Sequence, residues 1–315
     1  MKEIGGYFGL ERFGGKVYHD CAIAVNSARN ALLFLLKARS IEKLYIPRFL
    51  CDTVSELCLR EGYAYEEYAI DASFLPVFDT PLKPNEYLYI VNFYGQLTDE
   101  QILQYKARWN NIIVDHVQDF FRKPLPGIDA VYSCRKFFGV PDGGYAATDA
   151  VLPYELPMDI SKDRMKHILG RFEETGSAYY ADFQENDESF YTMPLKKMSA
   201  LTQNILAAID YDAVRSKRNA NYRLLDQMLG DLNSLKLMQP DGPYCYPFYC
   251  QNGMEIKKQL AANKIYVATL WPNVLKYDCT IEKDFAENIL PLPCDQRYDE
   301  SDIMHMVNCI RSIII

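Results

Sequence analysis

The sequence lacks the cysteine and histidine spacing on which metal and disulfide frameworks depend. Its nine cysteines include no CxxC pair, and its four histidines are scattered along 315 residues. Structural zinc sites use closely spaced pairs of these residue types, so the sequence predicts no metal site. The odd number and irregular spacing of the cysteines indicate reduced thiols in a cytoplasmic protein.

Long apolar runs and excess positive charge are also missing. The runs Ala31–Leu36 and Ile112–Val114 are far too short to span a bilayer, and residues 1–15 lack the apolar core of a signal peptide. The chain has 34 basic and 42 acidic residues, for a formal net charge of -8, whereas nucleic-acid binders normally show a basic face. We therefore expect a soluble cytoplasmic protein with no membrane and no nucleic-acid partner.

The early glycines do not have the arrangement that dinucleotides require. They follow no predicted strand and do not form a GxGxxG motif, which argues against a dinucleotide enzyme. These glycines are Gly5, Gly6, Gly9, Gly14 and Gly15.

Short β-rich runs alternate with helical stretches through the first two thirds of the chain. This alternation predicts an α/β fold with a mainly parallel central sheet. The predicted strands are Ala22–Val25, Lys43–Ile46, Tyr65–Ile70, Tyr87–Asn92, Asn111–Asp115, Ala130–Ser133 and Gly144–Thr148.

The remainder has the size of a second, smaller α+β domain. Ser199–Leu229 is predicted to be helical with a break near Asp210, so we place the domains at 1–210 and 211–315. After this helix we predict strands at Tyr246–Cys250 and Ile265–Ala268 and helices at Glu255–Asn263 and Ser301–Arg311.

Asp115 follows the apolar run Ile112–Val114, at the end of a predicted parallel strand. Open α/β sheets bind ligands at this edge, and Gln118 is close enough along the chain to reach the same ligand. Taken alone, Asp115 is equally consistent with a cap on the next turn.

Ser133, Arg135 and Lys136 follow the next apolar strand. A lysine that is desolvated at a strand end can react as a neutral amine, as Schiff-base chemistry requires, and the serine and arginine could contact a phosphate. Alone, such a lysine is also typical of a solvated surface charge. Gly143 and Gly144 then permit either a close backbone approach or a simple turn.

Asn26–Leu32 runs from a strand end into a helix. Free N–H groups at a helix N-terminus suit a phosphate, and Arg29 adds a positive charge. The order of these three segments, all expected at one edge of one parallel sheet, is more informative than any one of them.

These segments resemble the DegT/DnrJ/StrS family of aminotransferases, which use pyridoxal 5′-phosphate (PLP). NSARNAL is similar to the family's phosphate loop, VDHVQ to its acidic strand end, and SCRKFFGVPDGG to its Schiff-base segment. Three later segments follow in the family's order. KKMSALTQNILAAID resembles a family helix, RNANYRLLDQML the helix that opens the small domain, and NILPLPCDQRYDESDI the C-terminal strand and helix. The resemblance implies PLP fold type I.

The resemblance also implies roles for individual residues. Lys136 would form the Schiff base, Asp115 would pair with the pyridine nitrogen, and Gln118 would face the ring hydroxyl. The phosphate would contact Ser133 and the turn formed by Ser27, Ala28 and Arg29, where guanidinium replaces the family's usual threonine. Phe49 falls where the family places an aromatic against the ring.

The implied activity is transfer of an amino group from a donor, by family habit glutamate, to a keto substrate such as a nucleotide-linked keto sugar. A homodimer with shared active sites is implied too. Two alternatives stay open: a PLP-dependent lyase or dehydratase, and a regulatory homologue without catalysis. The short N-terminal segment and the short stretch between Asp115 and Lys136 imply substrate-recognition loops that differ from those of the family. Leu195 stands where the family often has an asparagine that reaches the partner subunit's phosphate.

Overall fold

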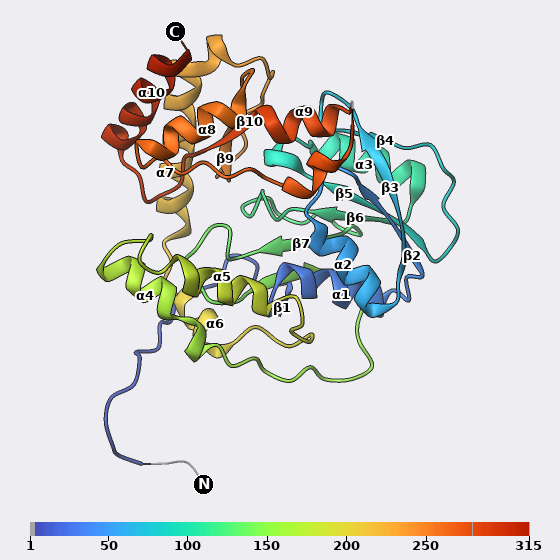
Figure 1. Cartoon of the computed structure of the whole chain (residues 1–315). Coiled ribbons are helices and arrows are strands. Elements are labelled where there is room, and N and C mark those ends of the chain that lie inside the picture. Colours follow the sequence, from blue (N-terminus) through green and yellow to red (C-terminus); the bar gives the residue numbers. More distant parts are fainter. Residues whose placement is uncertain (1–3, 279, 315) are drawn as a thin grey trace.

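An eight-stranded sheet forms the centre of the N-terminal part of the chain (Figure 1). The computed structural model describes residues 4–278 and 280–314. The strands are β1 (Ile23–Val25), β2 (Lys43–Pro47), β3 (Ala64–Ile70), β4 (Pro76–Val77), β5 (Glu86–Val91), β6 (Ile112–Asp115), β7 (Asp129–Ser133) and β8 (Gly144–Ala147). Their order across the sheet is β1-β8-β7-β6-β5-β2-β3-β4.

The sheet is mixed, and most of its pairs are parallel. Strands β7, β6, β5, β2 and β3 run parallel to one another, whereas β8 is antiparallel to both β7 and β1, and β4 is antiparallel to β3. All residues of β6, β7 and β8 are buried, as expected for central strands covered on both faces. The predicted mainly parallel α/β fold is confirmed.

Helices cover this sheet, and α1 packs against β7 and β8. The six apolar residues Ala31–Leu36 are all buried, so this helix is enclosed on several sides rather than amphipathic. The helices of this part are α1 (Ala28–Ala38), α2 (Asp52–Glu61), α3 (Asp99–Trp109), α4 (Lys166–Glu173), α5 (Tyr180–Ser189) and α6 (Ala200–Leu206), with short 3₁₀ helices η1 (Phe93–Gly95) and η2 (Lys162–Arg164).

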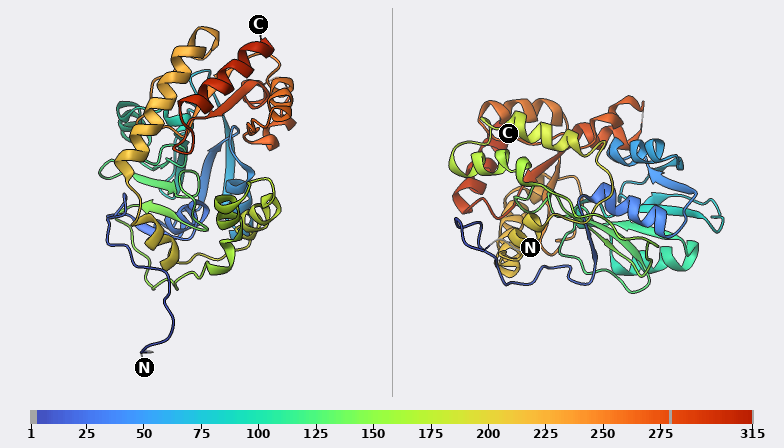
Figure 2. Two further views of the ribbon diagram at one scale, coloured as in Figure 1. Left: turned by 90° about the vertical axis from the view of Figure 1, so that its left-hand side faces the viewer. Right: turned by 90° about the horizontal axis from the view of Figure 1, so that it is seen from below.

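The C-terminal part carries a two-stranded antiparallel sheet and its own apolar cluster, which includes Leu225, Phe248 and Leu292. It contains α7 (Tyr211–Leu229), η3 (Gly230–Leu232), β9 (Cys245–Tyr249), α8 (Gly253–Ala262), η4 (Pro272–Lys276), α9 (Ile281–Asn288), β10 (Ile289–Pro293) and α10 (Glu300–Ile314). Figure 2 shows α7 running from the central sheet into this part and the N-terminal segment extending away from the body.

One predicted strand is wrong. Ile265–Ala268 has an alternating exposure pattern but belongs to no strand, and β9 pairs instead with β10. The local residue pattern did not predict β10, in which Pro291 and Pro293 lie, whereas the resemblance of NILPLPCDQRYDESDI to a family strand and helix implies a strand here. Proline lacks the N–H of a strand interior but is tolerated in an edge strand, and both strands of a two-stranded sheet are edges.

The proposed domain boundary near residue 210 falls between α6 and α7. Trp271 and Phe285 nevertheless belong to the larger N-terminal core, so the two parts share packing. In residues 4–278 and 280–314 no helix is long and apolar enough to cross a membrane, and no cluster of potential metal ligands occurs. The eight described cysteines are free thiols, and Cys279 lies outside the described residues.

Candidate functional site

The three predicted segments meet at one edge of the sheet. Ser133 of β7 lies opposite Gly144 of β8, which in turn lies opposite Val25 of β1. Strand β8 therefore lies between β1 and β7. Because it runs antiparallel to both strands, its first residue rather than its last lies at this edge. A Cβ atom on Gly144 would lie 2.4 Å from the backbone carbon of Ser27, so only glycine allows the turn before α1 to pack this closely.

A cavity of about 230 Å³, which we call the Arg29 cavity, opens at this edge. Its lining includes seven of the eight residues expected at the cofactor site: Ser27, Ala28, Arg29, Asp115, Gln118, Ser133 and Lys136. These residues come from the start of α1, the end of β6 and the turn after β7. The convergence follows from the sheet order, because β6 and β7 are parallel neighbours that end side by side.

Arg29 contributes unused hydrogen-bond donors to the cavity. Its Nε and Nη1 atoms are buried without a partner among the described residues, and its guanidinium lies 4.5 Å from the centre of the Tyr191 ring. Burial lowers the pKa of Arg29. Buried donors are nearly always paired in proteins, so these two N–H groups can donate to an acceptor that the described residues do not supply.

Asp115 is the buried carboxylate of the site. Its Oδ2 accepts a hydrogen bond from the Tyr89 hydroxyl at 2.7 Å, and its Oδ1 accepts one from the Val117 N–H at 2.8 Å. Burial raises the pKa of Asp115, while these hydrogen bonds and the charge of Lys136 act in the opposite direction. A cation placed against this carboxylate would offset part of the cost of burying its charge.

Gln118 is held by its carbonyl group and leaves its amide group free. Its Oε1 accepts from the Tyr94 N–H at 2.8 Å, whereas its buried Nε2 has no partner among the described residues. The free Nε2 group can donate to an oxygen atom of a ligand in the cavity.

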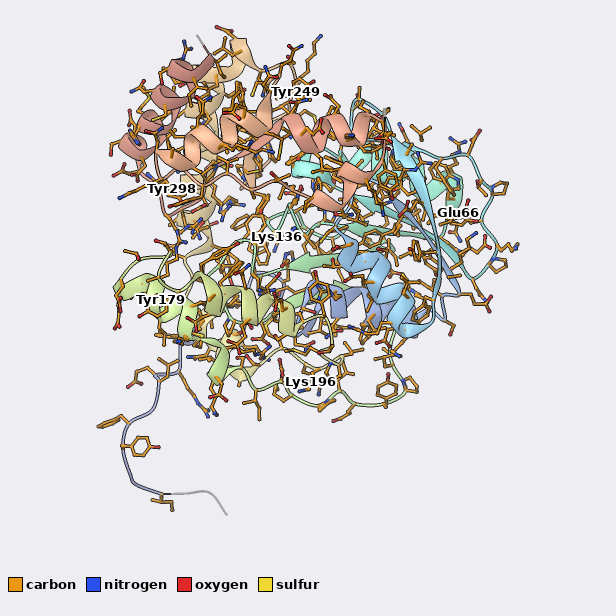
Figure 3. The ribbon with its side chains drawn as sticks, viewed as in Figure 1. Glu66, Lys136, Tyr179, Lys196, Tyr249 and Tyr298 are labelled. Carbon is orange, nitrogen blue, oxygen red and sulfur yellow. The ribbon has the colours of Figure 1, made fainter. Side chains whose placement is uncertain are left out.

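Lys136 lies in the middle of the molecule, between the C-terminal elements and α5 (Figure 3). Its segment leaves β7 in a tight turn, in which Cys134 O accepts from the N–H groups of Phe137 and Phe138 at 3.0 and 2.9 Å. Lys136 is exposed, so the chain alone does not desolvate the amine as expected. Any desolvation would have to come from a ligand or a partner chain.

Asp142 and Gly143 have structural roles beside the site. The fully buried Asp142 carboxylate accepts hydrogen bonds from the Ser199 N–H and hydroxyl at 2.8 and 2.7 Å, and also from Thr202. Gly143 has a φ of 118°, a conformation that favours glycine. These two residues therefore attach the segment after Lys136 to the start of α6.

A second cavity of about 420 Å³, which we call the Arg297 cavity, adjoins the first. Four residues line both cavities: Ser133, Arg135, Lys136 and Asp187. The other lining residues are Phe183, Tyr244, Cys245, Tyr266, Ala268, Pro291, Pro293, Asp295 and Arg297. Lys136 thus lines two adjoining cavities, and residues of the C-terminal part form most of the lining of the Arg297 cavity.

Phe49 is the one expected site residue that the structure does not bring to either cavity. It is 1% exposed and packs at 4.4 Å, edge to face, against the Trp271 ring. Trp271 lines the Arg29 cavity and was not identified from the sequence. Its lone position in a loop carries no motif, so only the folded chain reveals it.

The residues present fit PLP. The Arg29 cavity combines a lysine amine, a buried carboxylate and unpartnered donors on Arg29 and Gln118, which suit a carbonyl, a pyridine nitrogen and anionic oxygens respectively. The residues that make this match lie between Ser27 and Lys136 in the sequence and belong to several separate elements.

No known family model matches the sequence, and no curated protein matches it. Solved structures do match. NtdA from Bacillus subtilis, solved with bound PMP, has a TM-score of 0.67 at 17% identity, over 93% of this chain and 73% of that one. DesV from S. venezuelae has a TM-score of 0.64 at 17% identity, over 93% and 84%.

A DegT/DnrJ/EryC1/StrS aminotransferase from Brucella abortus has a TM-score of 0.61 at 16% identity, over 93% of this chain and 85% of that one. These identities support a common fold and leave the activity open. Across nearly its whole length, this chain has the PLP fold type I architecture of the DegT/DnrJ/EryC1/StrS aminotransferase structures.

Proposed function

We propose that this chain is a PLP-dependent aminotransferase in which Lys136 binds the cofactor covalently. The observation that carries the proposal is the Arg29 cavity, where the Lys136 amine, the Asp115 carboxylate and the unpartnered donors of Arg29 line one space. The shared fold supports the proposal, because the matched structures include aminotransferases.

The residues that would hold the cofactor divide by chemistry. Arg29, with Ser27, Ala28 and Ser133 beside it, would bind the phosphate at the N-terminus of α1. Asp115 would accept a hydrogen bond from the protonated ring nitrogen, and the free Nε2 of Gln118 would donate to the ring hydroxyl. Trp271, rather than Phe49, is the aromatic available to the ring because it lines the same cavity. When bound, PLP supplies an electron sink for carbanion chemistry.

Lys136 would act twice. It would first attach the cofactor, and after release its Nζ would carry a proton between the substrate carbon and the cofactor. A positioned base of this kind typically contributes about 10²–10⁴-fold in rate. Asp115 would remain ionised beside the cationic ring nitrogen and so maintain its charge.

The substrates we propose are an amino donor, glutamate, and a keto acceptor of the nucleotide-linked keto-sugar type. These assignments, the homodimer with shared active sites and the cytoplasmic location extend the resemblance seen in the sequence. Helix α5 lines both cavities, and its Asp187 side chain is half-exposed. A second subunit could therefore cover the two cavities from this side.

The test is covalent attachment followed by turnover. The full-length chain, incubated with PLP and reduced with borohydride, should retain the cofactor on Lys136 by peptide mass spectrometry, and Lys136→Ala should not. Amino donors should then convert bound PLP to pyridoxamine phosphate. A Lys136→Ala variant that kept both properties would refute the proposal. Release of ammonia without pyridoxamine phosphate would point to a lyase instead.

A further inference from the structure

Tyr89 on β5 brings a hydroxyl group to the carboxylate of Asp115 on the neighbouring strand. The two residues are 2% and 3% exposed, and the Tyr89 Oη donates to Asp115 Oδ2 at 2.7 Å. In the register of the sheet, Val91 rather than Tyr89 lies opposite Asp115. The tyrosine ring therefore extends along the sheet to the end of β6, where both side chains line the Arg29 cavity.

A second tyrosine holds the backbone at Tyr89. The pairing of β2 with β5 ends at Leu88, and the hydroxyl of Tyr68 on β3 donates to the carbonyl oxygen of Tyr89 at 2.7 Å. Tyr68 is itself buried. This contact fixes the strand position from which the Tyr89 ring reaches Asp115.

Both oxygens of Asp115 accept hydrogen bonds from the chain. Oδ1 accepts from the Val117 N–H at 2.8 Å, and each carboxylate oxygen keeps a second lone pair for a ligand. Burial raises the pKa of Tyr89, so its hydroxyl remains a neutral donor at physiological pH. The other titratable groups that interact with the Asp115 charge are Tyr68 on β3 and Lys136 in the turn after β7.

A buried acid and base that share a proton can form a neutral or an ionic pair. Removal from water favours the neutral pair, in which the proton lies on the carboxyl oxygen and the pyridine nitrogen is uncharged. Hydrogen bonds donated to a carboxylate favour its charged form. The Tyr89 hydroxyl and the Val117 N–H are both donors, so both favour the ionic pair.

We infer that Tyr89 is a positioning residue that keeps Asp115 ionised, so that a proton shared by Asp115 and the ring nitrogen of PLP stays on the nitrogen. The inference rests on the proposed function, in which the cofactor acts as an electron sink. The Val117 N–H belongs to the backbone, whereas Tyr89→Phe removes the side-chain donor alone. This variant therefore isolates the role of the hydroxyl.

The first measurement needs no cofactor. In the unloaded full-length chain, Tyr89→Phe should raise the folded-state pKa of Asp115 further above that of the unfolded chain. The stability deficit relative to wild type should therefore grow as pH rises from about 4 to about 8, because the ionised carboxylate has lost a donor. In the Asp115→Asn background the same change should give a deficit that does not vary with pH. Chemical denaturation of the four proteins makes the comparison, and a deficit that is independent of pH in both backgrounds would overturn the inference.

The second measurement locates the proton. PLP labelled with nitrogen-15 in its ring is bound to each variant, and the chemical shift distinguishes a protonated from an unprotonated ring nitrogen. Tyr89→Phe should move this signal toward the unprotonated form and weaken the affinity for PLP by about 10-fold. Tyr87→Phe is the matched control, because Tyr87 lies on the same strand and is not among the described residues that line either cavity.

A signal that is the same in Tyr89→Phe and in wild type would overturn the inference, because the hydroxyl would then have no effect on the shared proton. Failure of the borohydride test would reject the proposed function. The pH dependence of the unloaded chain decides separately whether Tyr89 acts on the charge of Asp115.

Discussion

Arg218 lies with its guanidinium carbon 4.5 Å from the centre of the Phe137 ring and donates to the Phe137 carbonyl at 3.3 Å. Its Nη1 also donates to Pro243 O at 2.8 Å. At 2% exposure, this cation is buried by contacts from both parts of the chain and has neutral oxygen partners. Burial lowers the pKa of Arg218.

Arg218→Met should therefore destabilise the fold. It removes hydrogen bonds to buried oxygens, which costs about 2–4 kcal/mol in the free energy of unfolding. Urea denaturation measures this loss, and Arg223→Met, at an exposed position of the same helix α7, serves as the control. Equal stability of the two variants would show that the contacts of Arg218 contribute little.

Arg29→Met should weaken the affinity for PLP by about 10- to 100-fold, because a charge-assisted contact with the phosphate is lost. The affinity for pyridoxal, which lacks the phosphate, should not change. Absorbance titrations with the two aldehydes make the comparison. A parallel loss for both would place Arg29 away from the phosphate.

Asp115→Asn should show a pH-dependent effect on the unloaded chain. Burial raises the pKa of Asp115, so the folded state binds more protons than the unfolded state. The resulting contribution to stability is present at low pH and is lost as pH rises from about 3.8 through the folded-state pKa. The variant lacks this loss, so its stability relative to wild type should increase from pH 4 to pH 7, as measured by chemical denaturation.

The same Asp115→Asn variant should also bind PLP more weakly, since it removes the charge that would pair with the ring nitrogen. Stability that falls with pH identically in both proteins would contradict the predicted pKa direction. Unchanged PLP affinity would contradict only the proposed ring contact.

Gly144→Ala should disrupt the turn before α1. The added Cβ would lie 2.4 Å from Ser27 C and 2.5 Å from Ala28 N, and overpacking of this kind costs about 1–3 kcal/mol. Both stability and PLP affinity should fall. Gly9→Ala is the matched control, because a Cβ there would have no atom within 4 Å. Wild-type PLP affinity in Gly144→Ala would show that this turn does not hold the phosphate.

Most of the sheet could be predicted from the sequence because its signals are local. The apolar run Ile112–Val114 followed by Asp115 predicts a buried strand that ends in a carboxylate, and β6 ends at that residue. Likewise, Asn26–Leu32 is predicted to run from a strand end into a helix, and α1 begins at Ala28, where the Ser27 side chain accepts from Asn30 N. Such features depend on neighbours within a few residues.

The prediction of a strand at Ile265–Ala268 is wrong because it also rests on a local pattern alone. Local alternation is not sufficient when no neighbouring strand supplies hydrogen bonds, and β10 forms despite two prolines because β9 lies beside it. Pairing between distant segments decides which candidate becomes a strand.

The sequence by itself determined the alternating elements and the order of Arg29, Asp115 and Lys136 along them. Only the tertiary structure decided that antiparallel β8 lies between β1 and β7, that Trp271 rather than Phe49 lines the Arg29 cavity, and that Arg297 shares a cavity with Lys136. Strand ends and helix caps are set by adjacent residues. The pairing of β1 with β8, and the positions of Trp271 and Arg297 beside Lys136, result instead from packing between segments more than a hundred residues apart, which no local pattern records.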